Sequence, residues 1–344
     1  MKAYMIWFLL LLLSLPVFSG NASAADLDDS MVGAWLKYRK GDFAGAEAAY
    51  TAVLKKKPKL VEALNNRGLC RVALQNYSGA VSDYNQVLAI NPDMAAAYNN
   101  RGLVWAKRGR YREAMSDYTA ALRINALMPE AYNNFGMAKK ALGDFYGALD
   151  DFSSAVAIRP VYPEALFNRG KVRLQLSDYK AAAKDFQQVI DYMPGYAEPH
   201  YQRGVSRSLS GDNRGALADF TRALAIDPKY PEALAARGLA RIRNREYSEA
   251  LDDLNTVIGM QPGKPDLYYL RALARTKLSD FAGAEEDCSS AIARKKGYSE
   301  AFFLRGIVRG ELGNREGMLA DLKRSSSLGY EYATKFLKKE SRRK

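Results

Sequence analysis

The apolar residues between Pro129 and Tyr162 recur at helical spacing in two short runs. The first run holds Tyr132, Phe135, Ala138 and Leu142, and the second holds Leu149, Phe152, Val156 and Ile158. Between the runs, Gly143 suits a left-handed residue that ends one helix, and Asp144 suits the N-cap of the next. The segment therefore predicts two short helices joined by a tight turn.

The same pattern returns every 34 residues, in nine units without insertion or deletion. The small residue of the first helix reads Ala34, Gly68, Gly102, Gly136, Gly170, Gly204, Gly238, Ala272 and Gly306. The alanine of the second helix reads Ala46, Ala80, Ala114, Ala148, Ala182, Ala216, Ala250 and Ala284, and becomes Met318 in the last unit. Because one such pair cannot bury its apolar face alone, the units are predicted to stack into an array with a continuous core.

These markers resemble the tetratricopeptide repeat (TPR) family over about Leu27 to Tyr332. A closing proline, also typical of the family, stands at Pro58, Pro92, Pro160, Pro194, Pro228 and Pro262 and is missing from the other three units. The resemblance implies an all-α, right-handed superhelical solenoid of antiparallel helix pairs. It also implies a concave face lined mainly by the first helix of each pair, and no enzyme activity of its own.

The first 24 residues stand apart from the array. Lys2 precedes an apolar run and the small residues Ala22 to Ala24, which predicts a secretory signal peptide cleaved after Ala24. The run is shorter than the roughly 20 apolar residues that span a bilayer, although an uncleaved anchor is the alternative. We therefore expect an exported protein, periplasmic in a Gram-negative bacterium and secreted otherwise.

The other end of the chain predicts a capping helix followed by a basic tail, together residues 333–344. Tyr332, Ala333, Phe336 and Leu337 lie at helical spacing, and the tail contributes to a formal net charge of +13. The two cysteines, Cys70 and Cys288, fall in the second and eighth units. Since each unit contacts only its neighbours, they are too far apart for a disulfide and are predicted to be buried packing residues.

Charged residues repeat with the same period. An arginine precedes the small residue at Arg67, Arg101, Arg169, Arg203, Arg237, Arg271 and Arg305, where the family usually has leucine. An aspartate of the second helix recurs at Asp83, Asp117, Asp151, Asp185, Asp219, Asp253, Asp287 and Asp321. We predict bidentate Arg–Asp pairs that set the stacking register, with an anion-binding arginine stripe as the alternative. Because Phe135 interrupts the arginines, Asp117 or Asp151 is expected to use Lys139 or Lys140 instead.

Paired asparagines mark the predicted concave face. The second member of each pair, at Asn66, Asn100, Asn134 and Asn168, is similar to the asparagine ladder of O-linked N-acetylglucosamine transferases, in which such amides hold a peptide backbone. A carboxamide offers both a donor and an acceptor, so it can bind any peptide unit. The preceding position turns aromatic at Phe167, Tyr201, Tyr269 and Phe303, which we add as peptide-binding candidates. The alternative is that these asparagines only satisfy local hydrogen bonds.

The sequence offers no enzyme chemistry. His200 is the only histidine and occupies a packing position, and there is no zinc motif, phosphate loop or HExxH. We predict no cofactor and no nucleic-acid partner. The predicted function is an exported scaffold or adaptor, monomeric or weakly oligomeric, that binds a protein or an extended peptide in its concave groove. The alternative is a cell-envelope component that organises an anionic polymer such as a polysaccharide.

Overall fold

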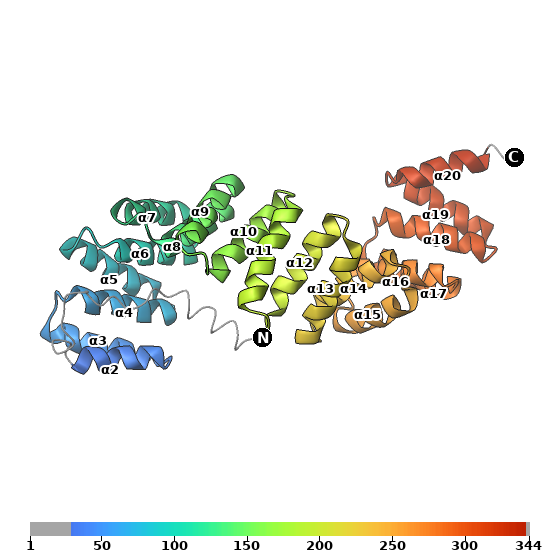
Figure 1. Ribbon diagram of the computed structural model, residues 1–344. Helices are drawn as coiled ribbons and strands as arrows, with labels where there is room; N and C mark the ends of the chain where they lie inside the picture. Colours follow the sequence, from blue (N-terminus) through green and yellow to red (C-terminus); the bar gives the residue numbers. More distant parts are fainter. Residues whose placement is uncertain (1–28, 342–344) are drawn as a thin grey trace. The chain divides into compact units, whose positions relative to one another are not determined.

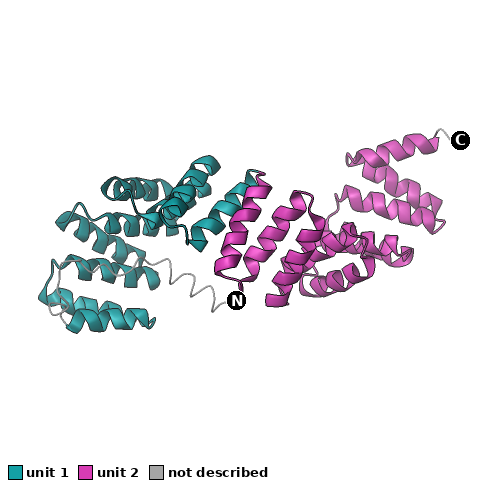
Figure 2. Cartoon of the chain, in the orientation of Figure 1, with its two compact units in different colours: residues 1–176 teal, residues 177–344 magenta. Residues whose placement is uncertain are grey.

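The computed structural model describes residues 29–341, and every regular element within them is an α-helix (Figure 1). The predicted signal peptide and the last three residues of the basic tail lie outside this range. The chain divides into two compact units, with Leu176 ending unit 1 and Ser177 beginning unit 2 (Figure 2). None of the helices between residues 29 and 341 has the length and apolar character needed to cross a membrane.

Unit 1 is a stack of antiparallel helix pairs. Each helix packs against the one before it and the one after it along the chain (Figure 1). Its helices are α2 (Asp29–Arg39), α3 (Phe43–Lys56), α4 (Val61–Ala73), α5 (Tyr77–Ile90), α6 (Ala95–Lys107), α7 (Tyr111–Ile124), α8 (Pro129–Ala141), α9 (Phe145–Ile158) and α10 (Pro163–Gln175). We number the repeats from α2–α3, so that α8–α9 is repeat four.

Unit 2 continues the same pattern. Its helices are α11 (Tyr179–Tyr192), α12 (Ala197–Leu209), α13 (Asn213–Ile226), α14 (Pro231–Arg243), α15 (Tyr247–Met260), α16 (Pro265–Lys277), α17 (Phe281–Arg294), α18 (Ser299–Glu311), α19 (Arg315–Ser327) and α20 (Glu331–Ser341). Repeat eight is α16–α17, and the two helices of repeat five, α10 and α11, belong to different units. The all-α fold of stacked helix pairs is thus confirmed.

The turn within each repeat has the predicted chemistry. Gly143 has a left-handed φ of +85°, and the Asp144 carboxylate accepts a hydrogen bond from the Gly147 amide at 2.9 Å, which caps α9. Glycine takes this conformation at least cost because it has no Cβ. In repeat two, Gln75 adopts the same left-handed conformation with φ +59°, so the turn is kept even without glycine.

The small residue of the first helix allows the two helices of a repeat to approach closely. A Cβ added to Gly136 would lie 2.9 Å from the ring of Phe152, which is fully buried. In repeat eight the partners are Ala272 and Cys288, where a smaller side chain leaves room for the methyl group. Cys288 is buried and free, as is Cys70, which confirms their prediction as packing residues.

The last helix begins slightly earlier than predicted. Helix α20 starts at Glu331 and packs against α19, with Ala333 buried between them. Phe336 and Leu337 are partly buried, whereas Tyr332 is 66% exposed. The helix therefore covers the end of repeat nine with Ala333, Phe336 and Leu337, and Tyr332 takes little part.

Candidate binding face

In each unit the first helices of successive repeats contact one another more closely than the second helices do. Among the described residues, α4, α6, α8 and α10 form such contacts in unit 1, and α12, α14, α16 and α18 form them in unit 2. The side of a stack on which neighbouring helices approach more closely is its concave side. We call the surface formed by these helices in each unit the first-helix face.

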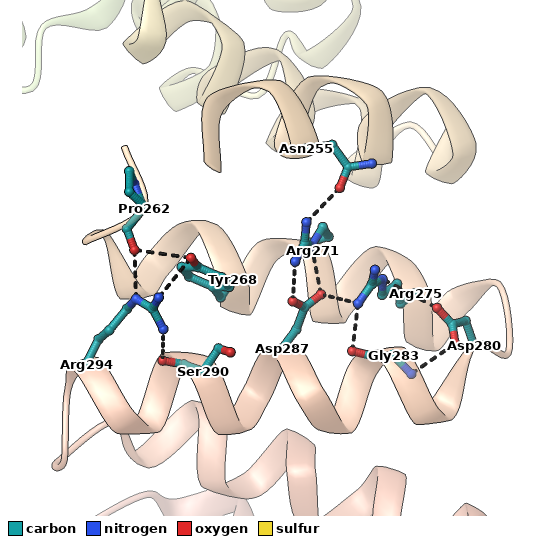
Figure 3. A network of polar contacts seen from close by, with 10 residues as sticks. All are labelled: Asn255, Pro262, Tyr268, Arg271, Arg275, Asp280, Gly283, Asp287, Ser290 and Arg294. Atoms are coloured by element: carbon teal, nitrogen blue, oxygen red, sulfur yellow. Dashed lines mark hydrogen bonds and ion pairs between the residues drawn. The ribbon is translucent and has the colours of Figure 1, made fainter. Parts of the chain in front are cut away.

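An Arg–Asp cluster links the two helices of repeat eight. Arg271 donates two hydrogen bonds to the carboxylate of Asp287, from Nε at 2.9 Å and from Nη2 at 2.6 Å (Figure 3). Arg275 Nη1 lies 2.9 Å from the other side of that carboxylate. Arg271 also donates to Asn255 of the preceding repeat at 2.7 Å. One arginine thus links its own pair of helices and the neighbouring repeat.

The predicted series recurs in both units. Arg67 and Arg101 bind Asp83 and Asp117 with Nη2–Oδ1 distances of 2.6 and 2.7 Å. The equivalent pair of Arg203 and Asp219 is also formed. Further pairs join Arg237 to Asp253 and Arg305 to Asp321. Arg169 lies in unit 1 and Asp185 in unit 2, so their pairing stays a prediction.

Repeat four is the irregular member of the series. Phe135 replaces the arginine, and Lys139 Nζ lies 2.8 Å from Asp151 Oδ2, one of the two substitutions that the sequence predicts. The same ammonium lies over the Phe135 ring, 4.1 Å from its centroid. Burial raises the pKa of the Asp151 carboxyl, because one lysine compensates only in part for its loss of water.

The predicted asparagines are buried between adjacent first helices. Asn100 Nδ2 donates to Asn65 Oδ1 at 3.1 Å, and Asn134 Nδ2 donates to Asn99 Oδ1 at 3.0 Å. Asn168 likewise donates to Asn133 at 3.1 Å. We call these contacts the amide ladder.

The amide ladder gives the predicted peptide-binding asparagines a role in stacking. Asn66 begins the ladder, because the equivalent of Asn65 in the preceding repeat is Met31, which has no amide. The four asparagines, Asn66, Asn100, Asn134 and Asn168, are all less than 10% exposed. The arrangement favours the local hydrogen-bonding alternative, and peptide binding by these amides stays a prediction. The acceptors Asn65, Asn99 and Asn133 escaped the sequence reasoning, although the doubled asparagines could have indicated them.

The lower end of the ladder reaches an acidic residue. Asn133 Nδ2 donates to Glu164 Oε1 at 3.2 Å. Burial raises the pKa of Glu164 to about 7, and the Asn133 hydrogen bond opposes this shift only in part. Glu130 nearby adds to the rise because its negative charge disfavours a second one.

In unit 2 aromatic pairs take the place of the amides. Tyr201 packs against Tyr230, Tyr269 against Tyr298, and Phe303 against Tyr330, with ring centroids 5.0 to 5.2 Å apart. The second ring of each pair belongs to the chain segment that leads into the next repeat. The first rings lie on first helices and are partly exposed, so they keep some surface for a ligand.

His200 is a packing residue, as predicted. It is buried, and its Nε2 lies 3.4 Å from the Pro194 carbonyl oxygen. Two repeats later, Tyr268 donates to the equivalent Pro262 carbonyl at 3.2 Å. Burial lowers the pKa of the imidazole. Within residues 29–341 no three His, Cys, Asp or Glu side chains are grouped to hold a metal ion.

The repeat geometry agrees with a family model described as tetratricopeptide repeat. The model matches residues 32–93, 71–129, 133–197, 201–265 and 235–299, which together make up more than half of the chain. The chain belongs to the TPR family. Among curated proteins, none matches this TPR chain significantly.

Solved structures share the TPR fold. A tetratricopeptide repeat protein from Parabacteroides merdae has a TM-score of 0.53 and 22% identity over 71% of this chain and 97% of its own. PilF of Pseudomonas aeruginosa has a TM-score of 0.54 and 16% identity over 60% of this chain and 94% of its own. YrrB, described as a TPR protein with an unusual peptide-binding site, has a TM-score of 0.48 and 23% identity over 55% of this chain and 97% of its own. At these identities the likeness shows the fold alone.

Proposed function

We propose that this TPR chain is an exported, non-enzymatic scaffold that binds an extended segment of a partner protein along its first-helix face. The observation that carries the proposal is the row of partly exposed aromatic rings Tyr201, Tyr269 and Phe303 in unit 2. Aromatic side chains supply a large apolar contact area at a low cost in side-chain entropy. Export is supported by the signal-peptide pattern of residues 1–24.

The rings are held ready for a ligand by their neighbours. Tyr201 contacts Tyr230 on one side and the buried Phe220 on the other, with centroids 5.0 and 5.9 Å away. Tyr230 in turn donates its hydroxyl hydrogen bond to Glu198. Because these contacts fix the rings before binding, little side-chain entropy remains to be lost when a partner docks.

The arginine series lends little support to the anionic-polymer alternative. The arginines that precede the small residue in repeats two, three, six, seven, eight and nine all bind aspartates of their own repeats. Their charges are therefore largely neutralised within the protein. The cations left for a polymer are the surface lysines and the basic C-terminal end.

A pull-down from an envelope extract of the source cells tests the proposal. Tagged residues 25–344 are washed at low and at high salt, and the retained molecules are identified by mass spectrometry. A partner held by aromatic rings should survive high salt, whereas a polyanion should be lost because salt screens charge. Retention of acidic polymer alone at low salt would replace the proposal with the alternative.

The chain supplies a matched control for the rings. The double variant Tyr201→Ala and Tyr269→Ala should reduce partner retention at least tenfold, and alanine already stands at the equivalent position 235 of repeat seven. Tyr146→Ala removes a ring that is 73% exposed on the second helix α9, so it should change nothing. Equal losses in the double variant and the control would count against the first-helix face.

A further inference from the structure

A pocket of about 430 Å³ opens between repeats four and five in unit 1. It is lined by Lys140, Phe145, Lys171, Leu174 and Gln175. All but Phe145 come from the first helices α8 and α10, so the pocket opens on the first-helix face. Phe145 comes from the start of α9.

The pocket gathers positive charge that the protein does not neutralise. Within residues 29–341 neither Lys140 nor Lys171 forms an ion pair, and Lys171 lies over the Phe167 ring at 5.7 Å. The neighbouring Lys139 differs, since its ammonium is bound to Asp151. Burial and, next, the charge of Lys171 lower the pKa of Lys140. An anion in the pocket would relieve this repulsion.

The rest of the lining narrows the kind of anion. Phe145 and Leu174 form apolar walls, and both side chains are partly buried. The side-chain amide of Gln175 can donate a hydrogen bond to an oxyanion. A group that carries its negative charge next to an apolar side chain would satisfy both parts of the lining.

We propose that this pocket holds a carboxylate of the bound segment, with an apolar side chain of that segment against Phe145 and Leu174. The carboxylate is supplied either by the C-terminus of the segment or by an Asp or Glu side chain. The assignment rests on the proposed function and adds to it a charged anchor in unit 1, at a distance along the chain from the rings of unit 2.

Small probes test the pocket without knowledge of the partner. N-acetyl-leucine, its amide, N-acetyl-aspartate α-amide and inorganic phosphate are titrated into residues 25–344. Binding is followed by NMR of ¹³C-dimethylated lysines, which keep their charge. N-acetyl-leucine should bind at least tenfold more tightly than its amide, which lacks the charge.

Variants connect the binding to the two lysines. Lys140→Gln combined with Lys171→Gln should weaken binding of N-acetyl-leucine at least tenfold, and circular dichroism checks that the fold is kept. Lys277→Gln on α16 removes an exposed lysine outside the pocket, so it should leave binding unchanged. The tighter of the two carboxylate probes identifies the source of the carboxylate.

Three results would overturn the assignment. They are equal binding of N-acetyl-leucine and its amide, unchanged binding by the double variant, and tighter binding of phosphate than of either carboxylate. A partner retained in the pull-down without any probe binding would reject the pocket and leave the scaffold proposal standing. Probe binding without a retained protein partner would reject the scaffold proposal and leave the pocket.

Discussion

The two units join their first helices in different ways. In unit 1 the amide ladder runs from Asn65 to Asn168 through hydrogen bonds between successive repeats. In unit 2 the same positions carry aromatic pairs, such as Tyr269 with Tyr298. The small residues and alanines between the helices stay nearly constant in both. The comparison shows that packing within a repeat is uniform, whereas the chemistry between repeats is free to vary.

Repeats four and eight show the same freedom in their ion pairs. Asp287 of repeat eight is bound by two arginines, Arg271 and Arg275, whereas Asp151 of repeat four is bound by Lys139 alone. A buried carboxylate is stable only where enough cations and hydrogen bonds replace its water. The rise in the pKa of Asp151 is the consequence of the missing arginine.

The largest effect is expected from removing the better-bound aspartate. Asp287→Ala should lower the free energy of unfolding of unit 2 by about 3 kcal/mol or more, because it leaves two partly buried guanidinium groups without a counter-charge. Asp151→Ala should lower that of unit 1 by about 1 kcal/mol, since burial already disfavours this carboxylate. Urea unfolding followed by circular dichroism measures both, and amide hydrogen exchange locates the loss. Equal destabilisation would refute the difference between the repeats.

The next effect concerns the amide ladder. Asn100→Ala should lower the free energy of unfolding by about 2 kcal/mol, because Asn65 Oδ1 loses its donor and Asn99 Nδ2 loses an acceptor inside the protein. The control is Gln202→Ala at the equivalent position of repeat six, where the amide bonds to Glu198 of its own helix. The same unfolding measurement applies. A loss for Gln202→Ala as large as that for Asn100→Ala would mean that the ladder adds nothing to stacking.

The smallest effect depends on pH. Because the pKa of Glu164 rises to about 7 from its ordinary 4.5, the folded protein holds this proton more tightly than the unfolded chain. Its contribution to stability is full below about pH 4.5 and is lost as the pH rises through 7. Glu164→Gln, which mimics the protonated form, should therefore be more stable than the natural chain at pH 8 by about 1 to 2 kcal/mol.

The pH effect carries its own control. At pH 4 the two proteins should have the same urea midpoint, since Glu164 is then protonated in both the folded and the unfolded chain. A difference that persists unchanged from pH 4 to pH 8 would show that the substitution acts through packing and not through the proton.

The sequence alone determined the fold and much of its detail. The period of 34 residues predicted the helix pairs, because small residues at fixed places allow close helix approach whatever their neighbours are. Gly143 and Asp144 predicted the turn and the cap, which depend on local backbone chemistry. The pairing of Arg271 with Asp287 and of Lys139 with Asp151 also followed from periodic charges on helices that must lie side by side.

Only the tertiary structure decided what the first-helix face presents. Asn100 and Tyr201 occupy neighbouring places in the repeat, yet the first is buried in the amide ladder and the second keeps exposed surface. The pocket of Lys140 and Lys171 joins residues 31 positions apart in the chain on two successive first helices. Periodicity shows which residues share a face. Whether a side chain on that face bonds to its neighbour or to a ligand depends on the distance between adjacent helices, which one chain's pattern does not contain.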